Sequence, residues 1–319
     1  MSHPYNLVIA NPLIDLAGAT ESLLLSVSPG SRRTYTVALK HFYNWLLSRD
    51  LVPARITYQV LGHYQAELLA SFARATAATR IAVVRSLFDE HAKLTGAPNP
   101  TRGLKPIHVA NESPHVALTR SQARDLLRAI DQSTLIGKRN YAIIKLLLHT
   151  GLRRSECAAL SIGDIRQQEG HFVANIEHGK GDKRRLVKLK GEVLRAIADW
   201  LAENEAWNKS ERGKVNPRDL SPEAPLFTQI GKGGNLTSAR ISDKVIERLV
   251  KRLARQIAEP RLTPHGLRAT FITLAKEGGA SLEQRQFAAG HADARTTQRY
   301  DRRKLNLDDN AADYIRIDA

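Results

Sequence analysis

The first third of the chain carries apolar residues at helical spacing. From residue 31 onward these are Tyr35, Ala38, Leu39, Phe42, Trp45 and Leu46. Most of the charged residues between them fall on other faces, which is typical of an amphipathic helix. Two further stretches, residues 58–72 and 75–94, continue the pattern. We predict a compact helical bundle over residues 31–96, preceded by an N-terminal extension over residues 1–30.

The pattern stops after Gly96. Residues 97–117 are rich in Pro, Gly and Asn and have no periodicity, which predicts an extended linker. Helical spacing then resumes, with Thr119 as the N-cap of one helix and a second helix over about 138–149. We therefore expect a second domain over residues 118–303 and a C-terminal tail over residues 304–319.

Alternation with a period of two replaces helical spacing between residues 171 and 190. The runs FVANIE and RRLVKL are joined by HGKGDK, whose two glycines suit a β-hairpin turn. The polar run over residues 203–225 predicts a loop, and a long basic helix is expected from Thr237 or Ser238 to about Ile257. The fold class is thus mainly α with a small β-hairpin: a helical bundle followed by a mixed α+β domain.

The stretch from Thr263 to Gly290 predicts two capped helices. Thr263 and Pro264 begin the first, and His265 and Arg268 are three residues apart, which places them on one face. Gly278 and Gly279 end that helix, Ser281 and Gln284 form a capping box for the second, and Gly290 closes it. His291 follows directly, and Tyr300 lies in a later helical run over residues 296–303.

An upstream segment, HTGLRRSE at residues 149–156, adds a turn at Gly151 and places Arg153 and Glu156 on one helical face. Lys180 lies at the predicted hairpin tip. Planar guanidinium groups suit the charge of a phosphoryl group in transit, and a phenol is a nucleophile once a base takes its proton. The candidate catalytic residues are Arg153, Lys180, His265, Arg268, His291 and Tyr300, with Glu156 orienting the groups around Arg153.

The composition favours a polyanionic partner. The formal net charge is +16 and the isoelectric point is about 10.1, and each Lys or Arg set against a phosphate releases condensed counterions. Nucleic acid is the first expectation; a ribosome-associated protein or solvated lysine faces are the alternatives. The candidate DNA-contacting residues are Arg32, Arg33, Arg80, Arg85, Lys183, Arg184, Arg240 and Lys244.

Several other classes are disfavoured. A single cysteine, Cys157, excludes an internal disulfide framework, and we interpret it as a packing residue. GKGG at residues 231–234 lacks the Ser or Thr of a phosphate-binding loop, so no cofactor is expected, and the acidic residues show no metal-ligand spacing. The first residues lack the basic start of a signal peptide and the length of a membrane span. We expect a cytoplasmic, nucleoid-associated protein.

The order and spacing of the candidate residues resemble the tyrosine recombinase (phage integrase) family. Arg153 matches the arginine of the family's G-L-R-x-S-E, His265 and Arg268 its H-x-x-R, and His291 and Tyr300 its G-H-x8-Y. Lys180 matches the family's hairpin lysine.

The resemblance implies a SAM-like core-binding domain before the catalytic domain, in the two-domain Xer-like branch. It also implies double-stranded DNA target sites, a 3′-phosphotyrosine, and four protomers that exchange strands through a Holliday junction. In the family such a tail docks on a neighbouring protomer; a helix packed on its own domain is the alternative. An accessory DNA-binding protein or a partner recombinase remains possible. A type IB topoisomerase and a non-catalytic DNA-binding factor are the alternative classes.

Overall fold

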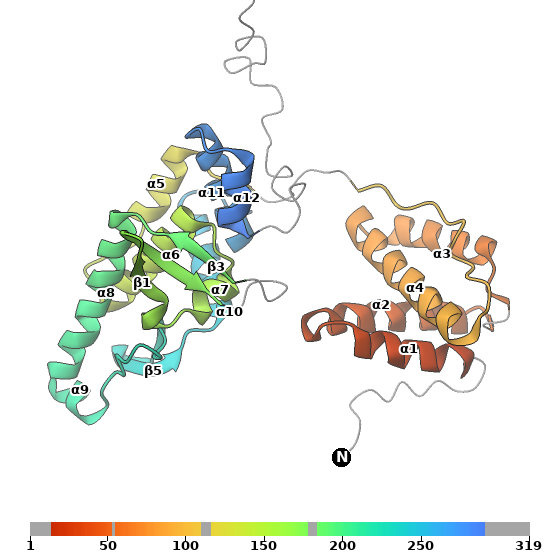
Figure 1. The fold of residues 1–319 in the computed structure, drawn as a ribbon, viewed down its shortest axis with the longest axis horizontal. Helices are drawn as coiled ribbons and strands as arrows, with labels where there is room; N and C mark the ends of the chain where they lie inside the picture. Colours follow the sequence, from red (N-terminus) through yellow and green to blue (C-terminus); the bar gives the residue numbers. More distant parts are fainter. Residues whose placement is uncertain (1–13, 53–54, 110–115, 178–183, 291–319) are drawn as a thin grey trace, which may run out of the picture. The chain divides into compact units, whose positions relative to one another are not determined.

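The computed structural model describes residues 14–52, 55–109, 116–177 and 184–290. The chain divides into two compact units, residues 1–110 and 111–319, and the division falls within the segment expected to be a linker. The first unit is a bundle of helices, and the second combines helices with small antiparallel sheets (Figure 1). The predicted fold class, mainly α with a small β component, is confirmed.

The first unit contains four described helices: α1 (Ile14–Ser26), α2 (Pro29–Leu47), α3 (Tyr58–Ser71) and α4 (Arg74–Thr95). Thr57 accepts a hydrogen bond from the amide of Val60 and so caps α3. Gly96 ends α4 in the left-handed conformation, at φ +72°. Helices α1 and α2 both pack against α4.

The bundle begins earlier than predicted. Residues 14–26 of the expected extension form α1, whose Leu16, Ala19 and Leu23 are buried in the core of the bundle. Thr20 hydrogen-bonds the hydroxyl of Tyr43 on α2. The apolar spacing of these residues is the local signal for this helix.

An aromatic cluster fills the bundle core. The ring of Phe42 is fully buried and lies 5.1 Å from that of Tyr64, which lies 4.9 Å from that of Trp45. The indole of Trp45 donates to Glu67 at 2.9 Å. Burial raises the pKa of Tyr64, so this phenol stays neutral and serves packing.

The second unit is organised around α6, most of whose residues are buried. The helices are α5 (Arg120–Arg128), α6 (Leu135–Thr150), α7 (Arg154–Ala159), α8 (Gly191–Lys209), α9 (Glu211–Val215), α10 (Asp243–Gln256), α11 (Pro264–Glu277) and α12 (Leu282–Ala289). The strands are β1 (Ile165–Gln168), β2 (His171–Ile176), β3 (Arg185–Lys188), β4 (Thr228–Ile230) and β5 (Leu236–Arg240). Helices α8 and α11 both pack against α6.

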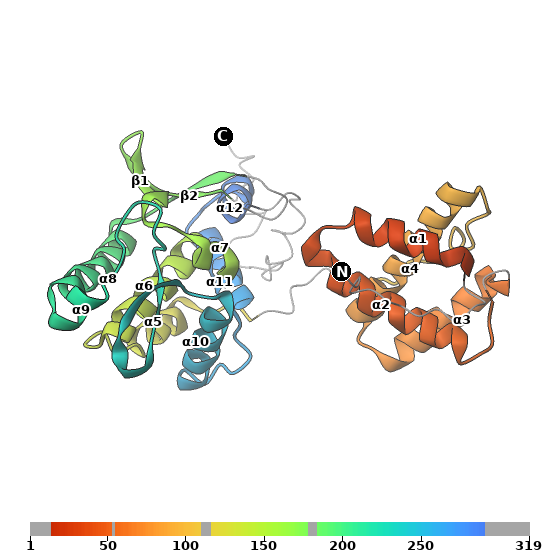
Figure 2. The same cartoon turned by 90° about the horizontal axis from the view of Figure 1, so that it is seen from below.

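The strands form two antiparallel sheets, one of order β1-β2-β3 and one of β4-β5. The predicted hairpin pairs β2 with β3, and the register sets Ile176 opposite Arg185. Both views place α12 beside the three-stranded sheet (Figures 1 and 2), and a hydrogen bond from Arg185 to the carbonyl of Ala288 joins them. This hydrogen bond therefore holds the three-stranded sheet against the end of α12.

Two predicted segments differ from the structure. The polar run over residues 203–225 contains the end of α8 and all of α9, and is not only a loop. The helix expected from residue 237 begins at Asp243, with Ser242 as N-cap, because residues 236–240 form β5 and pair with β4. Strand β1 was not predicted at all. In each case a tertiary contact decides over local composition.

None of the helices in the described part of the chain is long and apolar enough to cross a bilayer.

Candidate active site

Two of the predicted catalytic residues, Arg153 and Arg268, converge where α6 ends and α7 begins. Gly151 ends α6 at φ +63°, and a Cβ there would lie 2.4 Å from the ring of Phe271 on α11. Only glycine permits both this backbone conformation and this close packing. The turn therefore packs against α11 directly before Arg153, the N-cap of α7.

Arg268 on α11 holds this turn from inside the protein. Arg268 is 2% exposed, and its Nη1 donates to the carbonyl oxygen of Gly151 at 2.6 Å. Its Nη2 donates to the carbonyl oxygen of Ala289 at the end of α12. One guanidinium thus ties the Gly151 turn to α12. His265 lies in the first turn of α11, is exposed, and is positioned by the Thr263 N-cap.

Glu156 is a buried carboxylate with four hydrogen-bond donors. Oε1 accepts from Nη1 of Arg153 at 2.7 Å and from Nη1 of Arg185 at 3.1 Å. Oε2 accepts from the backbone amide of Arg153 at 2.8 Å and from Nη2 of Arg185 at 2.8 Å. Burial alone would raise the pKa of Glu156, but the bonds from Arg185 and Arg153 outweigh it and hold that pKa below its ordinary value. Glu156 is therefore ionised between two arginines.

Arg185 is the residue of this cluster that sequence reasoning missed. It is the first residue of β3, and its side chain is 6% exposed. Arg185 and Val187 are buried while their neighbours are not, so the alternation of RRLVKL puts an arginine on the apolar face of the strand. That misplaced charge is the signal that would have found it, because a buried charge needs a partner.

Three arginines donate to three successive carbonyl oxygens at the C-terminal end of α12. Arg185 Nε reaches Ala288 at 3.4 Å, Arg268 Nη2 reaches Ala289, and Arg153 Nη2 reaches Gly290 at 3.5 Å. The outer two bonds are long and weak, and the Arg268 bond is close. The last carbonyls of a helix lack partners within it and carry partial negative charge, so guanidinium groups stabilise this end.

The glycine that ends α12 is required by the same cluster. Gly290 has φ +64°, and a Cβ there would lie 2.8 Å from Cζ and Nε of Arg185. The guanidinium of Arg185 therefore packs against the bare face of Gly290. The position of α12's end, and so the point at which the chain continues to His291, is fixed by arginines from α7, β3 and α11.

Three of the six predicted catalytic residues, Lys180, His291 and Tyr300, lie outside the described residues, as does Lys183. Their predicted roles stay predictions. Segment 178–183, which carries Lys180, joins β2 to β3, and Arg185 is the second residue after it. The arginine cluster thus borders in sequence on both segments, 178–183 and 291–319.

Three of the candidate DNA-contacting residues are exposed: Arg33, Arg184 and Lys244. Arg85 donates to the carbonyl of Leu104, and the guanidinium of Arg80 lies 3.9 Å from the ring centre of Phe72.

Arg32 is half-buried, and its Nε is enclosed without a hydrogen-bond partner among the described residues. Arg240 donates to the carbonyls of residues 158–160 and to the hydroxyl of Ser161. We withdraw Arg240 from the predicted set, because its guanidinium holds the end of α7 to β5.

Cys157 lies in α7 and is fully buried. Burial raises the pKa of its thiol, so it remains protonated, in keeping with a packing residue. Within the described ranges, no cluster of three His, Cys, Asp or Glu side chains is arranged to hold a metal ion.

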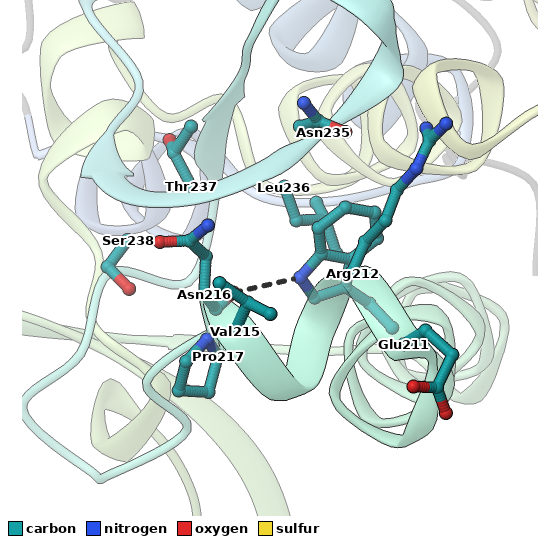
Figure 3. Close-up of a pocket in the computed structure, with 10 residues that line it drawn as sticks. Glu211, Arg212, Val215, Asn216, Pro217, Asn235, Leu236, Thr237 and Ser238 are labelled. Atoms are coloured by element: carbon teal, nitrogen blue, oxygen red, sulfur yellow. Dashed lines mark hydrogen bonds between the residues drawn. The ribbon is translucent and has the colours of Figure 1, made fainter.

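A hollow of about 820 Å³ lies between α9 and β5 (Figure 3). Two of the residues that line it are joined by a hydrogen bond, from the indole of Trp207 to the carbonyl of Asn216, at 3.2 Å. Glu211 and Arg212 are its charged lining residues, and Glu211 pairs with Lys214 at 2.6 Å. None of the lining residues belongs to the predicted catalytic set, so this hollow is not the candidate site.

Comparison with known proteins identifies the family. Residues 117–306 match the model of the phage integrase family, and residues 23–93 match its N-terminal SAM-like domain. A tyrosine recombinase of Synechococcus elongatus is 29% identical over 302 residues, which cover 90% of this chain and 89% of that protein. The tyrosine recombinase XerC of Myxococcus xanthus is 30% identical over 276 residues, 86% of this chain and 87% of the relative.

Solved structures show the same fold. The XerH site-specific recombinase bound to its difH substrate before cleavage aligns with a TM-score of 0.69 at 20% identity, covering 91% of this chain and 92% of XerH. A lambda integrase dimer bound to a core site aligns with a TM-score of 0.65 at 15% identity, covering 96% and 99% of the two chains.

The family match and these relatives identify a site-specific DNA recombinase of the tyrosine class. The chain belongs to the phage integrase family.

Proposed function

We propose that this protein cleaves and rejoins DNA through a 3′-phosphotyrosine at Tyr300 and exchanges strands between two sites through a Holliday junction. The observation that carries the proposal is the arrangement of Arg153 and Arg268, which meet at the Gly151 turn and the end of α12. The ten residues from His291 to Tyr300 follow that same end in the sequence.

Arg153 and Arg268 would bind the non-bridging oxygens of the scissile phosphate. Both guanidinium groups are held by protein acceptors before any DNA arrives, so no reorganisation opposes their action on the developing charge. A planar fork of donors also matches phosphate geometry better than an ammonium group.

The remaining roles fall to residues that the family pattern supplies. Tyr300 is the nucleophile, and His265, exposed in the first turn of α11, accepts or shares its proton. Lys180 protonates the leaving 5′ oxygen, and His291 hydrogen-bonds the phosphate. The cationic side chains take the place of a metal ion, and the phosphotyrosine conserves the bond energy, so rejoining needs no ATP.

Both units would grip the DNA. Residues 31–96, together with α1, would serve as the core-binding domain, residues 118–303 as the catalytic domain, and residues 304–319 as a tail that docks on a neighbouring protomer. Four protomers would assemble on two sites at the nucleoid, with or without a partner recombinase. The DNA-bound forms of XerH and lambda integrase support a duplex DNA partner.

The direct test is Tyr300→Phe. The variant should lose covalent attachment to a nicked suicide substrate while its affinity for the site changes little, because one oxygen is removed from a surface built mainly of phosphate contacts. Attachment at the wild-type rate would move the nucleophile elsewhere, with Tyr314 as the next candidate. Adduct formation would be measured on denaturing gels and binding by mobility shift.

A second assay separates this proposal from a type IB topoisomerase. Recombination requires two sites, so product should appear only when both are present. Relaxation of a supercoiled plasmid that lacks any site, at the rate of one that carries a site, would favour the topoisomerase.

A further inference from the structure

Arg185 shares the charge of Glu156 with Arg153. The formal charges of the two arginines and the carboxylate sum to one net positive charge. Each carboxylate oxygen accepts one hydrogen bond from each arginine residue, at 2.7–3.1 Å. Because Arg185 is buried and cannot reach solvent, the charge that stays accessible belongs to Arg153, whose side chain is 20% exposed. The arrangement leaves Arg153 able to meet an anion.

Loss of Arg185 would change how Glu156 holds Arg153. A buried carboxylate that loses one of two cations is undercompensated, and a flexible neighbouring guanidinium can rotate to cover both of its oxygens. Arg153 would then turn its fork toward Glu156 and away from the open side of the site. The long bond from Arg153 to Gly290, at 3.5 Å, is too weak to oppose this rotation.

A second contact points in the same direction. The guanidinium of Arg185 packs against Gly290, where a Cβ would lie 2.8 Å from its Cζ, and donates to Ala288. The side chain thus keeps the end of α12 at the distance from α7 that Arg153 spans. Both effects of Arg185 converge on the orientation of Arg153.

We propose that Arg185 is a positioning residue, which fixes Glu156 and the end of α12 so that the guanidinium of Arg153 stays free to bind the scissile phosphate. The inference rests on the proposed function, which assigns the phosphate to Arg153. Arg185 itself touches no DNA.

The test compares Arg185→Met with a matched control, Arg218→Met. Arg218 is also a buried arginine of the second unit, 2% exposed, and it donates to Asn204, Asp219 and Pro225. Both variants should lose stability, which urea unfolding would quantify. Only Arg185→Met should cleave slowly at saturating DNA, by about 100-fold, because a misplaced catalytic group costs that much. Its DNA affinity should change by less than about three-fold, since nearly all phosphate contacts remain. Equal cleavage rates for the two variants, per folded molecule, would overturn the proposal.

Two further readouts distinguish positioning of Arg153 from other routes. A substrate with a 5′-bridging sulfur needs no proton on its leaving group, so it should not rescue Arg185→Met. Rescue by sulfur would mean that Arg185 acts through the Lys180 segment, and would overturn the route through Arg153.

Adding Glu156→Gln should restore part of the rate in Arg185→Met, because the carboxylate that captures Arg153 is then neutral. Arg185→Lys should be intermediate, since an ammonium keeps the charge but not the fork.

An assay without DNA chemistry keeps the inference separate from the proposed function. Side-chain NMR of arginine-labelled protein should show the guanidinium signals of Arg153 shifted in Arg185→Met and unshifted in Arg218→Met. Unshifted Arg153 signals in Arg185→Met would contradict the positioning role even if DNA is cleaved normally. If wild-type protein forms no adduct at all, the proposed function fails, and the NMR result still decides the role of Arg185.

Discussion

The two units of this protein fill their interiors in different ways. The core of the first unit is apolar and aromatic, and its buried polar residues, within the described part, are the uncharged Thr20 and Thr101. The described part of the second unit buries six charged residues: Arg139, Glu156, Arg185, Arg218, Arg268 and Arg285. Burying a charge is costly unless hydrogen bonds and counter-charges compensate it, so a domain that only binds has no reason to do so.

The difference indicates a division of labour. Three of the six buried charges, Glu156, Arg185 and Arg268, meet at the end of α12, where the catalytic chemistry is proposed. The first unit holds no comparable cluster among its described residues, and we propose that its role is to contact DNA from a stable scaffold. Half of the buried charges described in the second unit thus lie where the proposal places the substrate.

The largest effect on stability is expected from the second unit. Glu156→Gln leaves the buried Arg185 and the partly exposed Arg153 without their counter-charge, and should lower the free energy of unfolding by roughly 3–5 kcal/mol. The folded-state pKa of Glu156 is held below its ordinary 4.5, so its stabilisation is present above about pH 4.5 and is lost as the pH falls through the folded pKa. The gap between wild type and variant, measured by urea unfolding, should therefore shrink below that pH. A gap independent of pH would contradict an ionised Glu156.

A smaller loss, in rate, is expected from Arg268→Lys. One ammonium cannot span the carbonyls of Gly151 and Ala289 and also meet a phosphate, so single-turnover cleavage should fall by about 10²–10³-fold. Arg139→Lys is the matched control, because Arg139 is buried and donates to Thr228 at 3.0 Å without touching this cluster. Similar rate losses in both variants would mean that any buried arginine serves equally.

The local signals in the sequence predicted much of this site, because capping and turn chemistry act within a few residues. Thr263 caps α11 and Ser281 with Gln284 forms the capping box of α12, as predicted. Gly151 and Gly290 take the left-handed conformations expected at helix ends.

The contacts that join distant segments could not be predicted. Arg185 meets Glu156 across 29 residues, and Arg240 meets the end of α7 across about 80, so only the folded chain brings them together. Residues 236–240 form β5 where the sequence predicted the start of a helix at residue 237. The cause is the same, because β5 forms by pairing with β4. The roles of Lys180, His291 and Tyr300 stay predictions.

In the first unit, a core change should affect stability alone. Phe42→Leu keeps most of the volume of a fully buried ring and should cost about 1 kcal/mol, measured as a shift in the unfolding of that unit. Cleavage at saturating DNA should remain at the wild-type rate, because no charged group moves. A slower chemical step would show that the bundle core contributes to catalysis, and the division of labour would fail.

The smallest effects are expected on the surface. Lys244 is exposed, so Lys244→Ala should lower the slope of log K against log salt by about 0.9 if it contacts one phosphate. Arg240→Ala should leave that slope unchanged, because its guanidinium is engaged with carbonyls inside the protein. The opposite outcome would restore Arg240 to the DNA-contacting set. Binding titrations at several salt concentrations would measure both.

The central claim is that both units grip DNA while the second alone carries the chemistry. The most direct measurement is the salt dependence of binding for the full chain and for residues 115–319, with circular dichroism confirming that the fragment is folded. We expect far weaker binding and a shallower slope for the fragment, since phosphate contacts from both units add to the slope and a linked second contact benefits from a high effective concentration. Equal slopes would mean that the bundle does not touch DNA, and would contradict the account.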